Sequence, residues 1–301
     1  MSGLAVFAHS ETGHECLRWL LDHGAKVALV VTHPDSSAES HLPSVGDLAR
    51  ARGLQPLVVD APDASTTARV RDAAPDLVLS FYFRHLLPAE LLAIPKRGAF
   101  NLHGSLLPKY RGRAPVNWAV ARGETETGAT LHAMTGRADA GEIVDQEPVP
   151  IGPDDTAWEV QKRVTQAGVL LLERRLAELL AGTAPRRAQD EARATVFPRR
   201  TPEDGRIDWS RSAEEVHNLV RAVTHPYPGA FTDVFGGKTF LWRTKLPHLG
   251  AHDNFPGQVR AEQGRLYVAC GDDRYVEVLR IQRDGQNEID ARHFLSDAVS
   301  P

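Results

Sequence analysis

The stretch LAVFAHSETGHECLRWLLDHGAKVALVVTH, residues 4–33, alternates a strand pattern with a helix pattern. Its two apolar runs, 4–9 and 26–33, have the length and composition of buried strands. Between them, residues 15–24 carry apolar side chains at helical spacing and end at Gly24, a residue that commonly follows a helix C-terminus. The stretch is therefore predicted to form a strand–helix–strand unit whose two strands are parallel.

The same alternation continues along the first third of the chain. Further strands are predicted at 55–60, 76–81 and 98–105, and helices at 44–53 and 65–74. This order predicts an α/β fold with a mostly parallel sheet. Such sheets bind ligands beyond the carboxyl ends of their strands, so we expect one functional rim to contain His9, Ser80–Arg84 and Asn101–Ser105.

The second half of the chain changes character. Strand patterns at 127–134 and 142–151 are followed by a long amphipathic helix at 156–181, which Gly182 ends. A polar, proline-marked stretch then leads to a helix at 212–223, where Ser212 and Glu215 are spaced as a capping box. Short strand patterns follow at 238–246, 257–271 and 275–283. We therefore predict three parts: an α/β domain at 1–182, a linker at 183–204 and a small β-rich domain at 205–301.

Composition and charge narrow the class of protein. The 301 residues have ordinary globular composition, and the only cysteines are Cys16 and Cys270, too few for a disulfide framework. No apolar run is long enough to span a bilayer, and the N-terminus has no basic segment typical of a signal peptide. We therefore expect a cytoplasmic protein.

The charge distribution disfavours a nucleic-acid partner. The net charge is −4, and residues 203–301 hold 12 Lys and Arg against 15 Asp and Glu, a local balance of −3. The loop at 33–49 has no Lys or Arg and three acidic residues, Asp35, Glu39 and Asp47. Binding to nucleic acid relies on basic side chains that neutralise phosphates.

Motifs for dinucleotides and metals are missing from the sequence. The first predicted strand is followed by HSETGHE, residues 9–15, instead of a G-x-G-x-x-G turn, and no P-loop pattern occurs. His9 and His14 do not form an H-E-x-x-H pair. We therefore expect neither a dinucleotide cofactor nor a metal ion.

The segment FNLHGSLLPKYRGRAPVNW, residues 100–118, carries a candidate catalytic pair. Asn101 and His103 are two residues apart on a predicted strand, so their side chains share one face. A histidine can accept a proton from an attacking amine, and the Asn amide can stabilise a developing oxyanion. Alternatively, the histidine bonds a nearby main-chain group and the asparagine ends the strand. Asp139, in the turn GRADAG, can either pair with His103 or form a local Asx turn.

These segments resemble a known family. The pattern NLHGSLLPKYRG at 101–112, followed by the D-x-G turn at Asp139, resembles the signature of formyltransferases that use 10-formyltetrahydrofolate. The similarity extends to RRTPEDGRIDW at 199–209 and HPYPGAF at 225–231. It implies a Rossmann-like catalytic domain, a C-terminal domain related to the OB fold, and 10-formyltetrahydrofolate as co-substrate.

The resemblance also implies residue roles. His103 would be the general acid and base, Asn101 would stabilise the tetrahedral transition state, and Asp139 would raise the pKa of His103. The co-substrate would contact Arg113 and the stretch Thr135, Gly136, Arg137, Ala138 and Asp139, and its pterin pocket would be lined by His85, Leu86 and Leu87.

The acceptor amine is a separate question. SFYFRHLLP at 80–88 and GETETGATLH at 123–132 most resemble members that formylate UDP-4-amino-4-deoxy-L-arabinose, an activity of lipid A modification. Lys109, Arg111 or Arg113 can face a diphosphate in this interpretation. The alternatives are a small amino acid such as N5-hydroxyornithine, methionyl-tRNA, and water in a formyltetrahydrofolate hydrolase.

Overall fold

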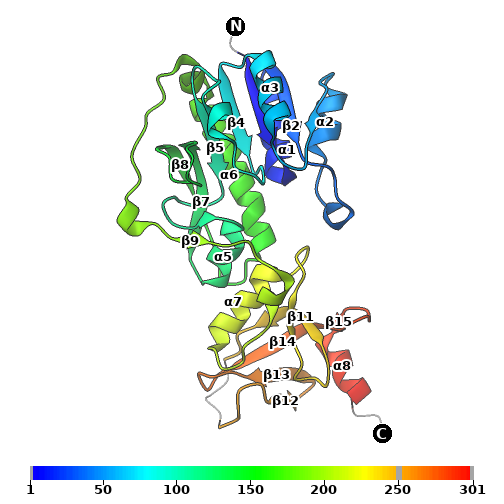
Figure 1. Cartoon of the computed structure of the whole chain (residues 1–301). Coiled ribbons are helices and arrows are strands. Elements are labelled where there is room, and N and C mark those ends of the chain that lie inside the picture. The colour runs from blue at the N-terminus through cyan, green and yellow to red at the C-terminus, as the bar shows by residue number, and fades with distance from the viewer. Residues whose placement is uncertain (1–2, 249–252, 299–301) are drawn as a thin grey trace. The chain divides into compact units, whose positions relative to one another are not determined.

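The computed structural model describes residues 3–248 and 253–298, and their contacts divide the chain into two units. The first unit comprises residues 1–115, 127–149 and 161–197. The second comprises residues 116–126, 150–160 and 198–301. Figure 1 labels helices and strands of both units.

A seven-stranded sheet forms the centre of the first unit, in the order β3-β2-β1-β4-β5-β7-β8. Neighbouring strands from β3 to β5 are parallel, whereas β7 runs antiparallel to β5. The strands are β1 (Leu4–Ala8), β2 (Val27–Thr32), β3 (Leu57–Val58), β4 (Leu77–Phe81), β5 (Ala99–His103), β7 (Glu126–Ala133) and β8 (Ile143–Pro150). The predicted mostly parallel α/β sheet is confirmed.

Helices cover both faces of this sheet. They are α1 (Ser10–Asp22), α2 (Val45–Ala51), α3 (Ala64–Ala73), α4 (Ala89–Leu92) and most of α6 (Ala157–Ala181). One core cluster joins Phe7, Val31 and Val78 of the sheet to Val70 of α3 and Leu91 of α4. Strand side chains alternate between faces, and this alternation lets both sets of helices bury apolar strand residues.

The helix α6 lies directly against the strand that carries the candidate pair. A Cβ added at Gly168 of α6 would lie 2.4 Å from a methyl group of Leu102, so this helix position tolerates only glycine without displacing Leu102. Leu102 is buried between Asn101 and His103 on β5. Because neighbours along a strand point to opposite faces, Asn101 and His103 point away from α6.

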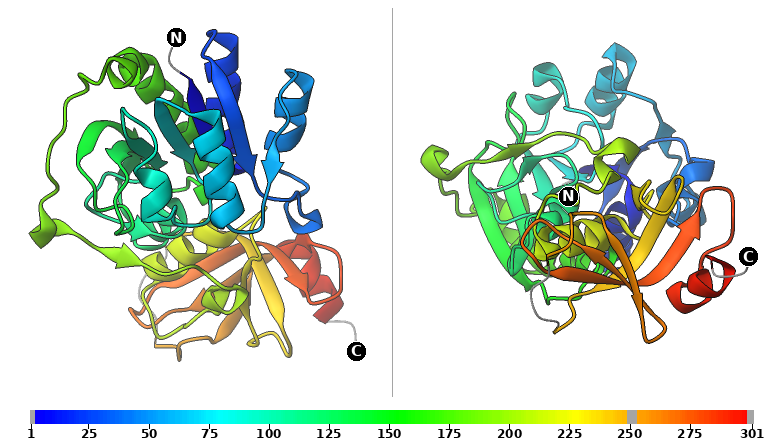
Figure 2. Two further views of the ribbon diagram at one scale, coloured as in Figure 1. Left: turned by 45° about the horizontal axis from the view of Figure 1, so that its top comes forward. Right: turned by 90° about the horizontal axis from the view of Figure 1, so that it is seen from below.

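Residues 183–197, in the stretch predicted as a linker, belong to the first unit. The chain that follows α6 returns along this unit (Figures 1 and 2). It ends in β9 (Val196–Phe197), which pairs in parallel with β6 (Arg111–Gly112). The ring of Phe197 stacks on Tyr110 with centroids 4.8 Å apart. This segment therefore contacts the loop that follows the candidate pair.

The second unit is built on an antiparallel sheet. Its strands follow the order β10-β11-β14-β13-β12, and β15 pairs with β14. They are β10 (Ala230–Thr232), β11 (Thr239–Lys245), β12 (Val259–Glu262), β13 (Arg265–Ala269), β14 (Tyr275–Arg283) and β15 (Ile289–Asp290). The helices of this unit include α5 (Pro115–Ala121, from residue 116), α7 (Ala213–Val223) and α8 (Ala291–Ala298). The predicted β-rich region and the Ser212–Glu215 capping box are confirmed.

Both cysteines, Cys16 and Cys270, are buried with free thiols. Burial raises the pKa of the Cys270 thiol to about 12. Within the described residues, no group of three or more His, Cys, Asp and Glu side chains is arranged to hold a metal ion. A search of the same residues for a helix with the length and apolar character of a membrane span found none.

Candidate active site

Strand register brings the candidate pair together with a second histidine. Asn101 and His103 lie on β5 on the same face as Ala99, which belongs to the core beneath α3 and α4. In the antiparallel pairing of β5 with β7, His132 lies directly opposite Asn101. Side chains opposite each other in such a pair share a face, so the His132 ring meets the Asn101 amide.

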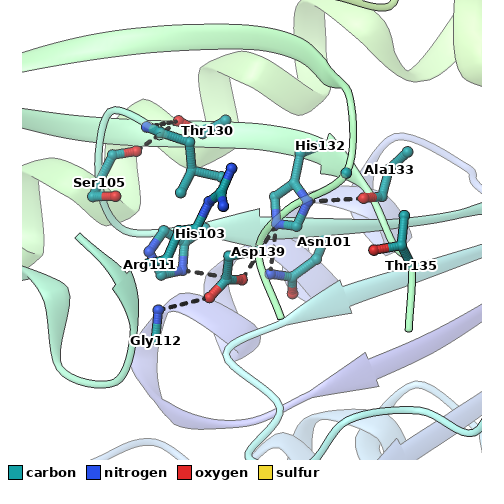
Figure 3. Close-up of polar contacts among 12 residues, drawn as sticks. Asn101, His103, Ser105, Arg111, Gly112, Thr130, His132, Ala133, Thr135 and Asp139 are labelled. Atoms are coloured by element: carbon teal, nitrogen blue, oxygen red, sulfur yellow. Dashed lines mark hydrogen bonds and ion pairs between the residues drawn. The ribbon is translucent and has the colours of Figure 1, made fainter. Parts of the chain in front are cut away.

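His103 is buried and held at both ring nitrogens. Its Nε2 lies 2.8 Å from the main-chain oxygen of Tyr110, in the loop that follows β5. Its Nδ1 lies 3.5 Å from Oδ1 of Asp139 (Figure 3). A carbonyl oxygen only accepts, so Nε2 carries a proton, which leaves Nδ1 as the nitrogen that gains or loses one.

Asp139 is fixed by its turn and by a main-chain donor. It has a φ of +52°, in the left-handed region, and its Oδ2 accepts a hydrogen bond of 2.9 Å from the Gly112 N–H. Burial opposes ionisation of this carboxyl, but the neighbouring His103 and His132 rings and the Gly112 N–H outweigh that effect. They hold the pKa of Asp139 well below its usual range. The predicted meeting of Asp139 with His103 therefore occurs, with an ionised carboxylate.

His132 fixes the orientation of the Asn101 amide. Its Nδ1 faces the Ala133 carbonyl oxygen at 2.9 Å and so carries a proton. Its Nε2 lies 3.2 Å from Asn101 Nδ2 and 3.5 Å from Oδ1 of Asp139, so the neutral ring accepts from the Asn101 amide and the protonated ring donates to the carboxylate. The second N–H of this amide has no acceptor assigned among residues 3–248 and 253–298, and it is available to a substrate oxygen.

A cavity of about 350 Å³ opens at the carboxyl ends of β1 and β2. It is lined by His9 and by the loop after β2, and its lining includes five serines and two carboxylates, Asp35 and Glu39, but no Lys or Arg. His9 Nε2 lies 3.3 Å from Glu39 Oε2. Burial and the nearby charge of Arg84 lower the pKa of His9, which favours its neutral form. The lining is suited to a hydroxylated or cationic ligand.

Two arginines connect this cavity to the catalytic loop. Arg84 donates to the Glu39 carboxylate, and the Arg84 carbonyl accepts from the side chain of Arg113. Arg113 directly follows Gly112, the donor to Asp139. The cavity and the catalytic residues are therefore linked by successive contacts within the first unit.

The residues predicted to bind the co-substrate occupy different environments. His85 and Leu86 are exposed on the segment after β4, and the turn Thr135–Ala138 is exposed next to Asp139. Leu87, in contrast, is buried in the core cluster with its side chain away from solvent. Only the main chain of Leu87 is therefore left to face a ligand, whereas the side chains of His85, Leu86, Thr135 and Arg137 are exposed.

Arg111 does not serve as an exposed phosphate ligand. Its side chain is buried, and its guanidinium donates to Gln189 and forms a bidentate ion pair with Glu191. The suggestion that Arg111 faces a diphosphate is wrong for this reason. Lys109 and Arg113 are exposed on the same loop.

Three functional contacts were not predicted from the sequence: the ring of His132, the Tyr110 carbonyl and the Gly112 N–H. They support the two groups that can do chemistry here: the His103 ring, which can accept a proton, and the Asn101 amide, which can donate a hydrogen bond to an oxyanion. This combination is suited to acyl transfer to a nucleophile without a metal-bound nucleophile or a covalent enzyme intermediate.

Comparison with protein families gives two matches. Residues 6–176 match the family model described as formyl transferase, and residues 199–298 match the model of the formyl transferase C-terminal domain. The first model covers more than half of the chain and includes every residue of the candidate site up to Asp139.

Solved structures share the fold at low identity. WlaRD, a sugar 3N-formyl transferase crystallised with dTDP and 5-N-formyl-THF, is 17% identical with a TM-score of 0.73, and the match covers 95% of this chain and 99% of that one. The N-formyltransferase from Helicobacter canadensis, in complex with folinic acid and dTDP-3-aminofucose, is 19% identical with a TM-score of 0.75, covering 92% and 99%. HypX from Aquifex aeolicus with tetrahydrofolic acid is 18% identical with a TM-score of 0.65, covering 99% of this chain and 47% of that one.

Proposed function

This chain belongs to the formyl transferase family, and from that premise we propose that it moves a formyl group from 10-formyltetrahydrofolate to the amine of a sugar nucleotide. The observation that carries the proposal is the assembly of Asn101, His103 and Asp139 at the carboxyl end of β5, in a sheet that also has a polar cavity at the carboxyl ends of β1 and β2. The sugar N-formyltransferases with the same fold support the acceptor class.

The first acceptor we propose is UDP-4-amino-4-deoxy-L-arabinose. The segments at 80–88, 101–118 and 123–132 resemble the formyltransferase domain of the polymyxin-resistance protein ArnA, which formylates that sugar nucleotide. The serine-rich cavity beside His9 suits the hydroxyl groups of a sugar, and its carboxylates attract an amine.

The catalytic residues have distinct tasks in this reaction. 10-Formyltetrahydrofolate supplies an electrophilic formyl carbon on N10. Asn101 donates its available N–H to the formyl oxygen as negative charge develops on it. His103 accepts a proton from the attacking amine and returns it to the departing nitrogen, so the products are the formamide and tetrahydrofolate. Asp139 stabilises the charged ring that forms in between.

Binding of the co-substrate is assigned to the exposed rim beside these residues. We place the folate against Arg113, the turn Thr135–Ala138 and the segment His85–Leu87, with Leu87 contributing only its main chain. The exposure of Leu86, at 62%, supports this assignment because an exposed apolar side chain at a rim can pack against a pterin ring.

The test is a set of parallel incubations of the purified protein with 10-formyltetrahydrofolate. The acceptor arms are UDP-4-amino-4-deoxy-L-arabinose, dTDP-3-aminofucose, N5-hydroxyornithine, methionyl-tRNA and water alone. Mass spectrometry follows the acceptor and absorbance follows the folate. We expect a formylated sugar nucleotide, lost in His103→Ala and kept in Gln166→Ala, an exposed position on α6.

The other arms define how the proposal fails. Formylation of hydroxyornithine or tRNA instead of either sugar nucleotide would keep the chemistry and replace the acceptor. Turnover in water at a rate that no amine increases would make the protein a formyltetrahydrofolate hydrolase.

A further inference from the structure

A single side chain, Gln189, connects the turn that carries Asp139 to the loop that orients His103. Its Nε2 donates to the main-chain oxygens of Asp139, at 2.8 Å, and Gly141, at 2.7 Å. Its Oε1 accepts from Nε and Nη2 of Arg111, at 3.1 and 2.7 Å. Both donors and the acceptor of this amide are used, so its orientation is fixed.

On one side, Gln189 holds the turn that presents Asp139. Asp139 has a left-handed backbone, which disfavours a residue other than glycine by about 1–2 kcal/mol. The two hydrogen bonds from Gln189 fall on the carbonyl of Asp139 itself and on that of Gly141, two residues later. They therefore oppose relaxation of the turn toward an ordinary backbone conformation, which would move the carboxylate.

On the other side, Gln189 holds the loop that orients His103. Arg111 lies between two residues whose main chains contact the site: the Tyr110 carbonyl bonds His103 Nε2, and the Gly112 N–H bonds Asp139 Oδ2. The Arg111 guanidinium is buried and also forms an ion pair with Glu191, at 2.7 Å. This pairing satisfies a charge that would otherwise be costly to bury.

The geometry points to Gln189 as a positioning residue for formyl transfer: it fixes the separation between the Asp139 carboxylate and the His103 ring by joining their two supporting segments. The expected effect on kcat rests on the proposed function, whereas the expected effect on the positions of Asp139 and His103 does not. It assigns a catalytic contribution to the stretch after α6, which the sequence presents only as a polar linker.

The kinetic test compares Gln189→Ala and Gln189→Glu with the wild type, with Gln166→Ala as the matched control. We expect kcat to fall about 10- to 100-fold in both Gln189 variants, because displacement of a catalytic group by about 1 Å can cost that much. KM for the amine should change less than about twofold. Gln189→Glu still accepts from Arg111 but cannot donate to the two carbonyls, so it should lose kcat as Gln189→Ala does, and urea denaturation shows how much stability each variant loses with these bonds.

A double-mutant cycle separates positioning from general destabilisation. If Gln189 acts through Asp139, the variant with both Asp139→Ala and Gln189→Ala should be no slower than Asp139→Ala alone. The inference would be overturned if the losses of kcat in the two single variants multiplied in the double variant. It would also be overturned if Gln189→Glu kept the wild-type kcat, or if only KM changed.

A spectroscopic measurement tests the geometry without turnover. In protein labelled with ¹⁵N-histidine, the His103 ring signals are assigned from His103→Gln. Gln189→Ala should move them toward their positions in Asp139→Asn, while the signals of exposed His23 stay fixed. Unmoved His103 signals would overturn the inference. A shift of the His103 signals in Gln189→Ala would support the positioning role of Gln189 even if the wild type formylates no amine. Failure to formylate an amine would overturn only the proposed function.

Discussion

Replacement of Gly112 by alanine tests how closely the catalytic loop depends on the strand that follows α6. Gly112 has a φ of +99°, and an added Cβ would lie 2.3 Å from the main-chain oxygen of Phe197. Ordinary van der Waals contact begins at 3.4 Å, so β6 and β9 must separate by about 1 Å. That movement opposes the hydrogen bond from Arg113 N to Phe197 O, now 3.1 Å.

The expected magnitude follows from two contributions. The left-handed backbone costs alanine about 1–2 kcal/mol, and the steric overlap with a main-chain atom costs about 1–3 kcal/mol more. We therefore expect the free energy of unfolding to fall by about 2–5 kcal/mol. Because the Gly112 N–H holds Asp139 Oδ2, we also expect kcat to fall by up to about 100-fold.

Gly24→Ala is the matched control. Gly24 also has a left-handed backbone, with a φ of +73°, but a Cβ there would meet no atom within 4 Å. Urea denaturation of both variants therefore isolates the overlap with Phe197, which should make Gly112→Ala less stable by at least about 1 kcal/mol. If the two variants lose equal stability and Gly112→Ala keeps its kcat, the reasoning about this loop is refuted.

Three further predictions concern the same sheet. The His33 ring bonds main-chain groups at both nitrogens, and burial lowers its pKa to about 4. Between pH 6.5 and 4 the unfolded chain therefore takes up a proton at this residue, whereas the folded chain does not. The contribution of His33 to the free energy of unfolding is fully present above pH 6.5 and should be lost as the pH drops through this window. Urea denaturation at pH 7 and 4.5 should therefore show a smaller fall in stability for His33→Gln than for His23→Gln, the control at an exposed site. Asn101→Ala should lower kcat about 10²- to 10³-fold in the formylation assay while its melting temperature stays near that of the wild type. Leu102→Ala should cost about 2–5 kcal/mol in urea denaturation because it empties a buried site against α6, and an unchanged midpoint would contradict that packing.

The parallel strands could be predicted from the sequence because their signal is local. Buried strands such as β1 and β4 are continuous apolar runs, and glycines after the intervening helices mark their ends. The strand predicted at 55–60 forms only at Leu57–Val58, where β3 lies at the edge of the sheet and Val58 is 46% exposed. An edge strand pairs on one side only, so its length depends on its single neighbour and not on its own pattern.

The candidate pair could also be predicted, since Asn101 and His103 differ by the period of a strand. The contact of Asp139 with His103 could be expected only from the family resemblance, because no local pattern brings a turn after β7 to the end of β5. His132 carried a partial signal: it lies in a strand pattern at 127–134, but its position opposite Asn101 depends on the register of β5 with β7. Gln189 carried none, because a glutamine in a polar stretch is ordinarily solvated.

The catalytic residues and the acceptor-binding residues answer different chemical questions. A ring that accepts a proton and an amide that stabilises an oxyanion serve an amine or a water molecule equally well, so Asn101, His103 and Asp139 do not select between a transferase and a hydrolase. Selection requires a bound amine close to the formyl carbon and the exclusion of competing water. Asp35 and Glu39, which line the cavity beside His9, attract an ammonium group, whereas the reaction itself needs the neutral amine. If this cavity binds the acceptor, exchanging the loop after β2 should change the acceptor while leaving the chemistry of His103 intact.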